Sequence, residues 1–276
     1  MKWRVSFRLV GWVSFALVVT AFPWDLRPQA VHGYISERRD DKVAPATINR
    51  ELALMSAAIN FANKHWEWEL PNPFAGRKLR EPEGRVRWIT PAQADELVDA
   101  ARGNRRSPHL ADFILLALHT GCRSGELLGL EWSRVDLDAR LIHFEARHTK
   151  AKRRRSVPLN ATATRVVHAR KRFVEEHCPG SPWVLCRQNG QRLQWLHKGF
   201  ARACEHAGIE DFRIHDLRHT CAAWLVSAGA PLAEVRDLLG HASITMTERY
   251  AHLAPDNVRA AVARLDAIES QSRHTA

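Results

Sequence analysis

The stretch spanning residues 212–253 constrains the fold of this 276-residue chain most strongly, because it contains consecutive start and stop signals for helices. Apolar residues recur at helical spacing over 217–228, and Gly229 follows at the position of a left-handed C-cap. This pattern predicts a helix that begins near Asp216. Unpaired backbone N–H groups and the positive end of the helix dipole would make its first turn favourable for an anion.

Two further helices are predicted downstream in the same stretch. The first starts at Pro231, a residue suited to a first helical turn, and stops at Gly240. The second is a short helix for which Thr245 and Glu248 form a T-x-x-E capping box, and we expect Tyr250 in its second turn.

Four side chains at these helix ends point to chemistry on a phosphate. His215 and Arg218 lie together at the start of the first predicted helix, while His241 and Tyr250 follow the later ones. A phosphodiester in its charge-rich transition state would use both a guanidinium and an imidazole at a helix N-terminus. Each side chain alone is a weak signal, because H-x-x-R is common and a histidine after a glycine is usually structural.

Taken in order and spacing, the motifs HDLRHT, LLGH and T-x-R-Y-A-H resemble the C-terminal signature of the tyrosine recombinases, the phage-integrase family. The resemblance implies a mainly α fold with a small β-hairpin (α+β), built from a helical core-binding domain, a linker and a mixed helical catalytic domain. It also implies that Tyr250 is the nucleophile, that His215, Arg218 and His241 are catalytic, and that Asp216 supports them.

A second motif, T-G-C-R-S-G-E-L, lies earlier in the chain. Arg123 occupies a sharp turn beside the start of a helix, and Glu126 follows three residues on. An Arg-x-x-Glu pair is most often a surface ion pair worth less than about 1 kcal/mol. In this context it resembles the first motif of the family, which implies that Arg123 binds the phosphate and that Glu126 buttresses it.

A basic segment lies inside a predicted β-hairpin. Residues 141–144 and 156–159 are expected to pair as strands, and residues 147–155 between them hold six basic residues and no acidic one. Such a run is either a charged turn exposed to solvent or a DNA-binding segment in which phosphates neutralise the repulsion between the positive charges. By resemblance, Lys150 is the mobile catalytic lysine, and Lys152 is a second candidate because it replaces the usual turn glycine. The residues expected to contact DNA are Lys152, Arg153, Arg154 and Arg155.

The chain is predicted to contain two domains. Residues 77–88 have the charged, Pro- and Gly-containing composition of a linker. We expect a shortened helical core-binding domain, which clamps DNA, over 26–76 and the catalytic domain over 89–276. Within the catalytic domain, the sequence predicts a helix start with a capping box at Thr90 and Gln93, a helix stop at Gly121, a short strand over 183–185 and a helix over 192–208. In the family, a last helix such as the one predicted over 257–268 often docks on a neighbouring protomer.

Residues 1–25 form an atypical apolar N-terminus. Basic residues precede an apolar run over 9–22, which has the outline of a signal peptide but is short for a membrane span. Three alternatives remain open: an export signal, a buried first helix of the N-terminal domain, or a start that does not belong to the original protein.

Composition favours a polyanionic partner and a reducing compartment. The formal net charge is +11, and the five cysteines are widely spaced without a C-x-x-C pair. The sequence shows no carboxylate cluster, His/Cys ligand set or G-x-x-x-x-G-K-[ST] loop. We therefore expect a cytoplasmic protein that uses no metal and no other cofactor.

A tyrosine has an ordinary pKa of about 10, so its hydroxyl is almost entirely protonated at neutral pH and is a weak nucleophile. The expected mechanism compensates for this. Arg123 and Arg218 would bind the non-bridging oxygens of the phosphate. His215 would act as general acid and base near the tyrosine, and His241 would be a further donor to the phosphate. Lys150 would protonate the departing 5′-oxygen.

The predicted reaction is site-specific recombination through a 3′-phosphotyrosyl link, which conserves bond energy. The expected partners are double-stranded DNA with attachment-type sites, further copies of the chain in a synaptic tetramer, and an accessory DNA-bending or directionality protein. Two alternatives remain: a catalytically defective remnant that only binds DNA, and a type IB topoisomerase-like enzyme that relaxes DNA without a recombinant product.

Overall fold

The computed structural model describes residues 27–82, 84–104, 107–146, 154–254 and 262. Contacts between residues divide the chain into two compact units, Met1–Gly84 (unit 1) and Arg85–Ala276 (unit 2). The predictions for residues 1–25 and, apart from residue 262, for a helix over 257–268 concern segments outside the described residues. Among the described helices, none is both long enough and apolar enough to cross a membrane.

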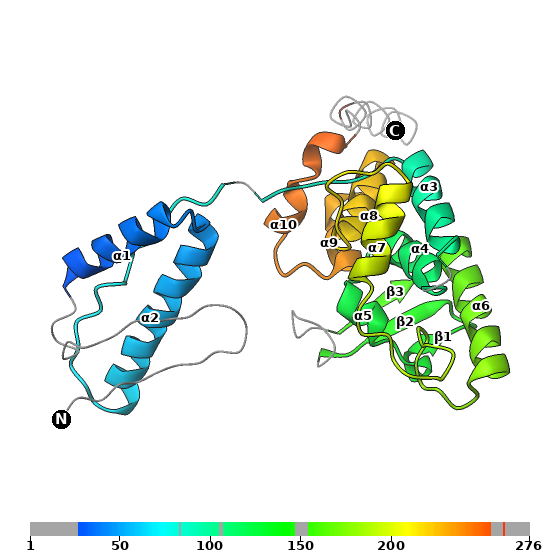
Figure 1. Cartoon of the computed structure of the whole chain (residues 1–276), viewed down its shortest axis with the longest axis horizontal. Coiled ribbons are helices and arrows are strands. Elements are labelled where there is room, and N and C mark those ends of the chain that lie inside the picture. The colour runs from blue at the N-terminus through cyan, green and yellow to red at the C-terminus, as the bar shows by residue number, and fades with distance from the viewer. Residues whose placement is uncertain (1–26, 83, 105–106, 147–153, 255–261, 263–276) are drawn as a thin grey trace, which may run out of the picture. The chain divides into compact units, whose positions relative to one another are not determined.

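Unit 1 is built on two helices, α1 (Pro28–Asp40) and α2 (Pro45–His65) (Figure 1). Each has a proline in its first turn. Backbone N–H groups in that turn make no hydrogen bond within the helix, so the lack of an N–H on proline costs no bond there. Glu51 of α2 is buried, and its carboxylate accepts from the Tyr34 hydroxyl at 2.6 Å and pairs with Arg38 at 2.7 Å. This bonding satisfies a carboxylate that would otherwise be costly to bury. The apolar core consists of Val31, Ile48, Leu52, Ile59 and Phe74.

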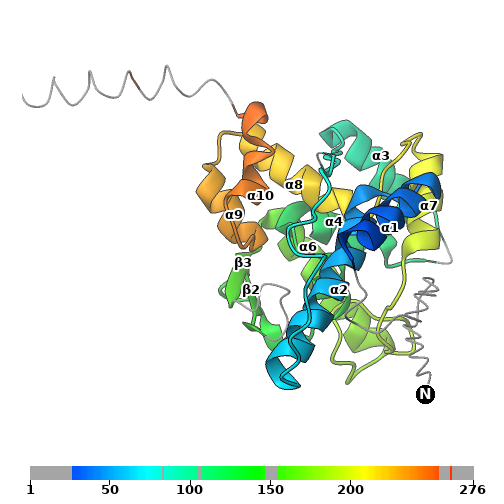
Figure 2. The same ribbon diagram turned by 90° about the vertical axis from the view of Figure 1, so that its left-hand side faces the viewer.

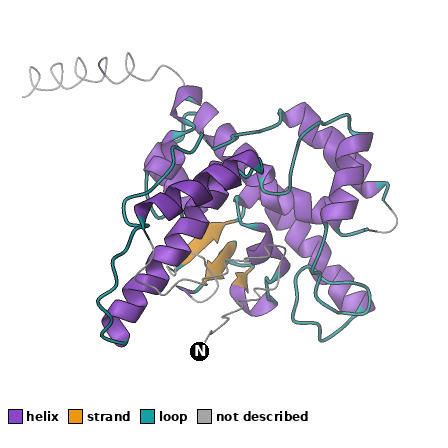
Figure 3. Cartoon of the chain, turned by 60° about the vertical axis from the view of Figure 1, so that its left-hand side comes forward, coloured by secondary structure: helices purple, strands orange, loops and turns teal. Residues whose placement is uncertain are grey.

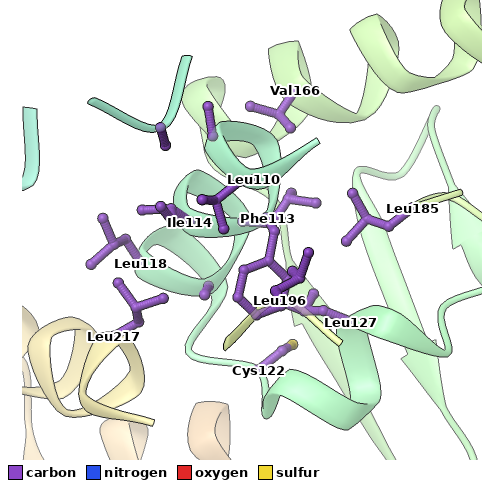
Figure 4. Packing of buried hydrophobic residues seen from close by; sticks show 14 of the residues in the cluster. Leu110, Phe113, Ile114, Leu118, Cys122, Leu127, Val166, Leu185, Leu196 and Leu217 are labelled. Carbon is purple, nitrogen blue, oxygen red and sulfur yellow. The ribbon is translucent and has the colours of Figure 1, made fainter. Parts of the chain in front are cut away.

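Unit 2 contains the larger core, with α4 at its centre in contact with α3, α5, α6 and α8. Figure 4 shows Leu118 of α4 beside Leu217 of α8, and Phe113 close to Leu127 and Leu196. The helices are α3 (Pro91–Arg102), α4 (Leu110–Thr120), α5 (Ser124–Leu128), α6 (Ala161–His177), α7 (His197–His206), α8 (Asp216–Ser227), α9 (Leu232–Leu239) and α10 (Thr245–Glu248), with the 3-10 turns η2 (Trp132–Arg134) and η4 (Ala251–Leu253).

A small antiparallel sheet accompanies these helices (Figure 3). Its strands, in spatial order, are β1 (Val135–Asp136), β2 (Leu141–Phe144) and β3 (Arg155–Pro158). The predicted hairpin is present as β2 and β3, with Ile142 opposite Val157, and β1 is an addition that the sequence did not indicate. β3 also contacts α9 (Figure 2). The mainly helical architecture with a small sheet confirms the predicted fold class.

Several helix ends in unit 2 lie at the residues that the local start and stop signals predict. Thr90 and Gln93 form the expected capping box of α3, and Gly121 ends α4 in the left-handed conformation at φ +62°. α8 begins at Asp216 as predicted. α9 has Pro231 as its N-cap instead of its first residue.

Two predicted elements of unit 2 are wrong in extent. The helix expected from Arg192 begins at His197, because the preceding segment is held in extended form by a bridge between Cys186 and Arg192. The Arg192 guanidinium also donates to the Leu128 carbonyl at 2.7 Å. The strand expected around Trp183 is reduced to a single bridge with Glu131.

Candidate catalytic site

Arg218 in the first turn of α8 joins two other parts of unit 2. Its guanidinium donates to the Gly121 carbonyl at 2.7 Å and to the Leu239 carbonyl at 2.6 Å. Those carbonyls lie at the C-terminal ends of α4 and α9, where backbone C=O groups have no hydrogen-bond donor within the helix. Arg218 supplies the missing donors. Arg218 is 4% exposed, and burial together with the nearby Arg123 charge lowers its pKa to about 10. The site therefore contains two neighbouring cations in low-dielectric surroundings.

Arg123 is the N-cap of α5 and is anchored by Glu126. The Arg123 backbone N–H donates to one Glu126 oxygen at 2.8 Å, and the guanidinium pairs with the other at 3.1 Å. The guanidinium also reaches the Gly240 carbonyl at 3.5 Å, the outer limit of a hydrogen bond. Arg123 and Arg218 thus bond neighbouring carbonyls at the end of α9.

Glu126 has a second cationic partner, Arg155 of β3, at 2.6 Å. Burial alone would raise the pKa of the Glu126 carboxyl, but hydrogen bonds from Arg155 and the backbone of Arg123 hold it below its usual range. Glu126 therefore stays ionised and fixes both arginines in place.

Arg155, which is predicted as one of the DNA-contacting residues of the basic run, is bonded within unit 2. Its side chain is 9% exposed, is paired with Glu126 and stacks over the Phe144 ring at 4.8 Å. A buried guanidinium must be paired, and the Glu126 carboxylate is the partner of this one. Arg154 is exposed and remains available. Lys150, Lys152 and Arg153 lie outside the described residues.

His241 follows Gly240, which ends α9 at φ +64°. Its Nδ1 lies 2.9 Å from the Thr247 hydroxyl oxygen, which fixes the orientation of the ring. Burial and the charges of Arg218 and Arg123 lower the pKa of His241 to about 3, so the ring is neutral near pH 7. A neutral ring bonded in this way can still present an N–H group to an anion.

Tyr250 occupies a different local structure from the one predicted. α10 ends before it, and Tyr250 is the N-cap of the 3-10 turn η4. The expected capping box is also absent, because Ile244 is the N-cap of α10 and the Thr245 backbone N–H donates to the Ser243 hydroxyl. Tyr250 is 1% exposed. Burial raises the pKa of its phenol to about 12.

The phenol packs against the apolar side of α8 and α9. The buried residues of this cluster are Ala222, Ala223, Val226, Val235, Leu239 and Tyr250. The tyrosine ring is thus fixed by the same two helices whose ends meet at Arg218, which ties its position to that of the cations.

The hydroxyl of Tyr250 makes a short contact with His219 Nδ1. The sequence predicts His215 near the tyrosine, whereas the imidazole that contacts its hydroxyl belongs to His219, one helical turn farther along α8. The two imidazole centroids are 5.1 Å apart, and His215 is exposed at the N-cap of the helix. The i, i+4 spacing of the two histidines was a signal that could have identified His219.

Asp216 holds the start of α8 through its carboxylate. Its buried carboxylate accepts from the Arg213 backbone N–H at 2.8 Å and pairs with Arg85 at 3.0 Å. An acidic group in the first turn also suits the helix dipole. Asp216 thereby fixes the turn from which His215 and Arg218 project.

The assembled site combines cationic donors that suit an anion with a buried phenol. Arg123 and Arg218 retain N–H groups beyond those already bonded, since each guanidinium has five donors. His241 follows the end of α9, and Tyr250 packs against α8 and α9. Within the described part of the chain, no group of three His, Cys, Asp or Glu residues is arranged to hold a metal ion.

Known proteins share both sequence and fold with this chain. Residues 87–257 match the phage integrase family. The integrase of Salmonella phage P22 is 31% identical, over 82% of this chain and 58% of the integrase, and that of Escherichia phage 186 is 30% identical, over 83% and 63%. The chain therefore spans less than two thirds of the length of these relatives. A structure of the Tn1549 transposon integrase with transposon right end DNA has a similar fold, with a TM-score of 0.71, 19% identity and coverage of 90% of this chain and 87% of that one.

Proposed function

Because the chain belongs to the phage integrase family, we propose that it is a site-specific DNA recombinase that cuts and rejoins DNA through a 3′-phosphotyrosyl intermediate. The observation that carries this proposal is the bridge made by Arg218 between the ends of α4 and α9. That bridge brings the segments of Arg123 and His241 to the helix that also contacts Tyr250.

A DNA phosphate would relieve the repulsion between the two arginines. Each guanidinium would donate to the non-bridging oxygens, and these bonds would strengthen as charge develops in the transition state. His241 would add a neutral donor. Burial, together with the neighbouring arginine charges, lowers the pKa of His241 and Arg218, and a bound anion would offset the part that comes from those charges.

In this reaction Tyr250 attacks the phosphorus and the 5′-oxygen departs with a proton. Lys150 is the proposed proton donor, and Lys152 is the second candidate. The new tyrosyl ester retains the energy of the broken phosphodiester, so rejoining needs no ATP. We propose that no metal or other cofactor takes part.

The proposed partner is double-stranded DNA with attachment-type sites, and Arg154 is an exposed candidate for phosphate contact. We propose that unit 1 serves as the core-binding domain, that the linker spans 77–88, and that a tetramer with an accessory DNA-bending or directionality protein forms the synapse. All five cysteines are free and buried, which supports action in the reducing cytoplasm.

The test is a nicked suicide substrate made from the DNA that flanks the gene. Loss of the short 5′ fragment would trap a covalent protein–DNA adduct, which we expect from the wild type and not from Tyr250→Phe. DNA binding without an adduct would indicate the catalytically defective remnant. Relaxation of supercoils at any sequence, without recombinant product, would indicate the topoisomerase-like alternative.

A further inference from the structure

We infer that His219 is a catalytic residue that accepts the proton of the Tyr250 hydroxyl during attack and returns it when the DNA is rejoined. This inference rests on the proposed function and deepens it. It gives the proton of the nucleophile a specific destination, a role that the sequence had assigned to His215.

The contact between the two groups is direct. His219 Nδ1 is the partner that the structure shows for the Tyr250 hydroxyl, and the two ring centroids are 6.0 Å apart. His219 projects from α8 one turn beyond His215, whose ring lies edge-on to it with centroids 5.1 Å apart. The phenol is buried, His219 is half-buried and His215 is exposed. The three rings therefore connect a buried hydroxyl to the protein surface.

The protonation state of His219 suits an acceptor. Burial, followed by the charge of His215, lowers the pKa of His219 to about 4, so the ring is neutral near pH 7. With the proton on Nε2, the Nδ1 lone pair faces the hydroxyl. The titratable and charged groups around the ring are His215 and Arg218 on α8, Arg249, Tyr250 and His241 on the segments after α9, and Arg85 before α3.

Binding of DNA would make His219 a stronger base at the moment of reaction. The cations near it depress its pKa by repelling a further positive charge. A phosphate at Arg218 adds negative charge beside the same ring and offsets that repulsion. Proton transfer would therefore become more favourable when the substrate is in place.

The proton balance of the step is complete. The Tyr250 oxygen forms a bond to phosphorus while its proton passes to His219 Nδ1, and the bond from phosphorus to the 5′-oxygen breaks with protonation of that oxygen by the general acid. On rejoining, the 5′-hydroxyl attacks the phosphorus and returns its proton to the general acid, while the phenol oxygen leaves and takes back the proton held by His219. His219 ends neutral, as it began.

The experiment compares His219→Asn with the wild type in single-turnover adduct formation on the suicide substrate. Asparagine retains an acceptor oxygen near the position of Nδ1 but cannot take the proton. Each protein is assayed on ordinary DNA and on DNA whose 5′-bridging oxygen is replaced by sulfur, a leaving group that needs no proton. His206→Asn, at the exposed end of α7, is the matched control, and Lys150→Ala is the leaving-group control.

We expect His219→Asn to form the adduct about 10²- to 10⁴-fold more slowly on both substrates. The sulfur substrate should rescue Lys150→Ala and not His219→Asn. The rate of the wild type should rise with pH and level off, whereas that of His219→Asn should keep rising toward ionisation of the phenol. A merely structural role would change DNA affinity or folding and would not change the shape of the pH profile.

A wild-type rate and pH profile in His219→Asn, or full rescue by the sulfur substrate, would overturn the inference and leave the proposed function standing. Absence of any Tyr250-dependent adduct from the wild type would overturn the proposed function itself. If His219→Asn unfolds, ¹⁵N NMR of the wild-type imidazoles decides. The Nδ1 resonance of His219 should shift in Tyr250→Phe, and an unchanged resonance contradicts the contact.

Discussion

The guanidinium of Arg155 lies 2.6 Å from the Glu126 carboxylate, which also accepts the backbone N–H of Arg123. One buried carboxylate thereby ties strand β3 to the turn that carries Arg123. Arg155 is the first residue of β3, so this ion pair fixes the start of the strand relative to Arg123.

Glu126→Ala should destabilise the protein by about 3–5 kcal/mol, because it leaves the Arg155 charge buried without a partner. Urea unfolding followed by circular dichroism measures the loss. Glu126→Gln keeps an oxygen for the Arg123 N–H and should lose less stability. Equal midpoints for the wild type and Glu126→Ala would show that Arg155 has found another partner, and the ion pair would then have no structural role.

Gly240→Ala should lower both stability and cleavage. The residue has φ +64°, and an added Cβ would lie 2.9 Å from Arg155 Nη1. The left-handed conformation alone costs about 1–2 kcal/mol for a residue with a Cβ. The clash adds to that cost and displaces His241, so adduct formation should slow as well.

Gly229→Ala is the matched control for that prediction. Gly229 has φ +87° with open space around its Cβ position, so the variant should lose stability from backbone strain alone and retain its cleavage rate. Thermal melting and single-turnover cleavage of both variants make the comparison. Equal cleavage rates in the two variants would contradict a positioning role for the end of α9.

These relationships show which parts of the site local sequence could predict. The helix stops at Gly121 and Gly240 were predicted because a C-cap is a property of a few adjacent residues. The contact of His219 with Tyr250 joins residues 31 apart, and that of Arg155 with Glu126 joins residues 29 apart. Both depend on how helices and strands pack, which charge and spacing along the chain do not determine.

The fold class was predictable for a related reason. Hydrophobic periodicity is repeated over many residues, so errors of one or two positions do not change the predicted element. The exact start of α7 was not predictable, because the apolar positions of Leu193 and Leu196 are buried equally well in an extended segment. The prediction that Leu193 and Leu196 are buried is confirmed, but the prediction that they lie in a helix is wrong.

The free energy of unfolding should fall as the pH decreases from about 6.5 toward 4. In that range, histidines that are buried and neutral in the folded protein bind protons in the unfolded chain, which stabilises the unfolded state. Burial lowers the pKa of His109 and His219 from 6.5 to about 4. Between those values the unfolded chain binds more protons than the folded one, so the stability present above pH 6.5 is progressively lost. His109 also accepts from Arg170 at 2.9 Å, which a protonated ring could not do.

Urea midpoints measured at pH 7.5 and pH 5 check this prediction. His109→Asn keeps an acceptor for Arg170 without a titrating ring, and it should lose less stability than the wild type over that interval. His206→Asn, at the exposed end of α7, is the surface control. A His109→Asn variant with the full wild-type pH dependence would exclude His109 as a source of the effect.

Arg218→Lys and Arg123→Lys should separate the structural and chemical roles of the two arginines. A lysine at 218 has one ammonium group and cannot reach the carbonyls of both Gly121 and Leu239, which Arg218 bonds at 2.7 and 2.6 Å. Arg218→Lys should therefore lose stability as well as about 10²- to 10³-fold in adduct formation. Arg123→Lys keeps the hydrogen bond from the backbone N–H of residue 123 to Glu126. This variant should therefore lose little stability and mainly slow adduct formation. Urea unfolding and single-turnover cleavage measure the two effects, and equal stability of the two variants would mean that the Arg218 bridge does not hold α4 and α9 together.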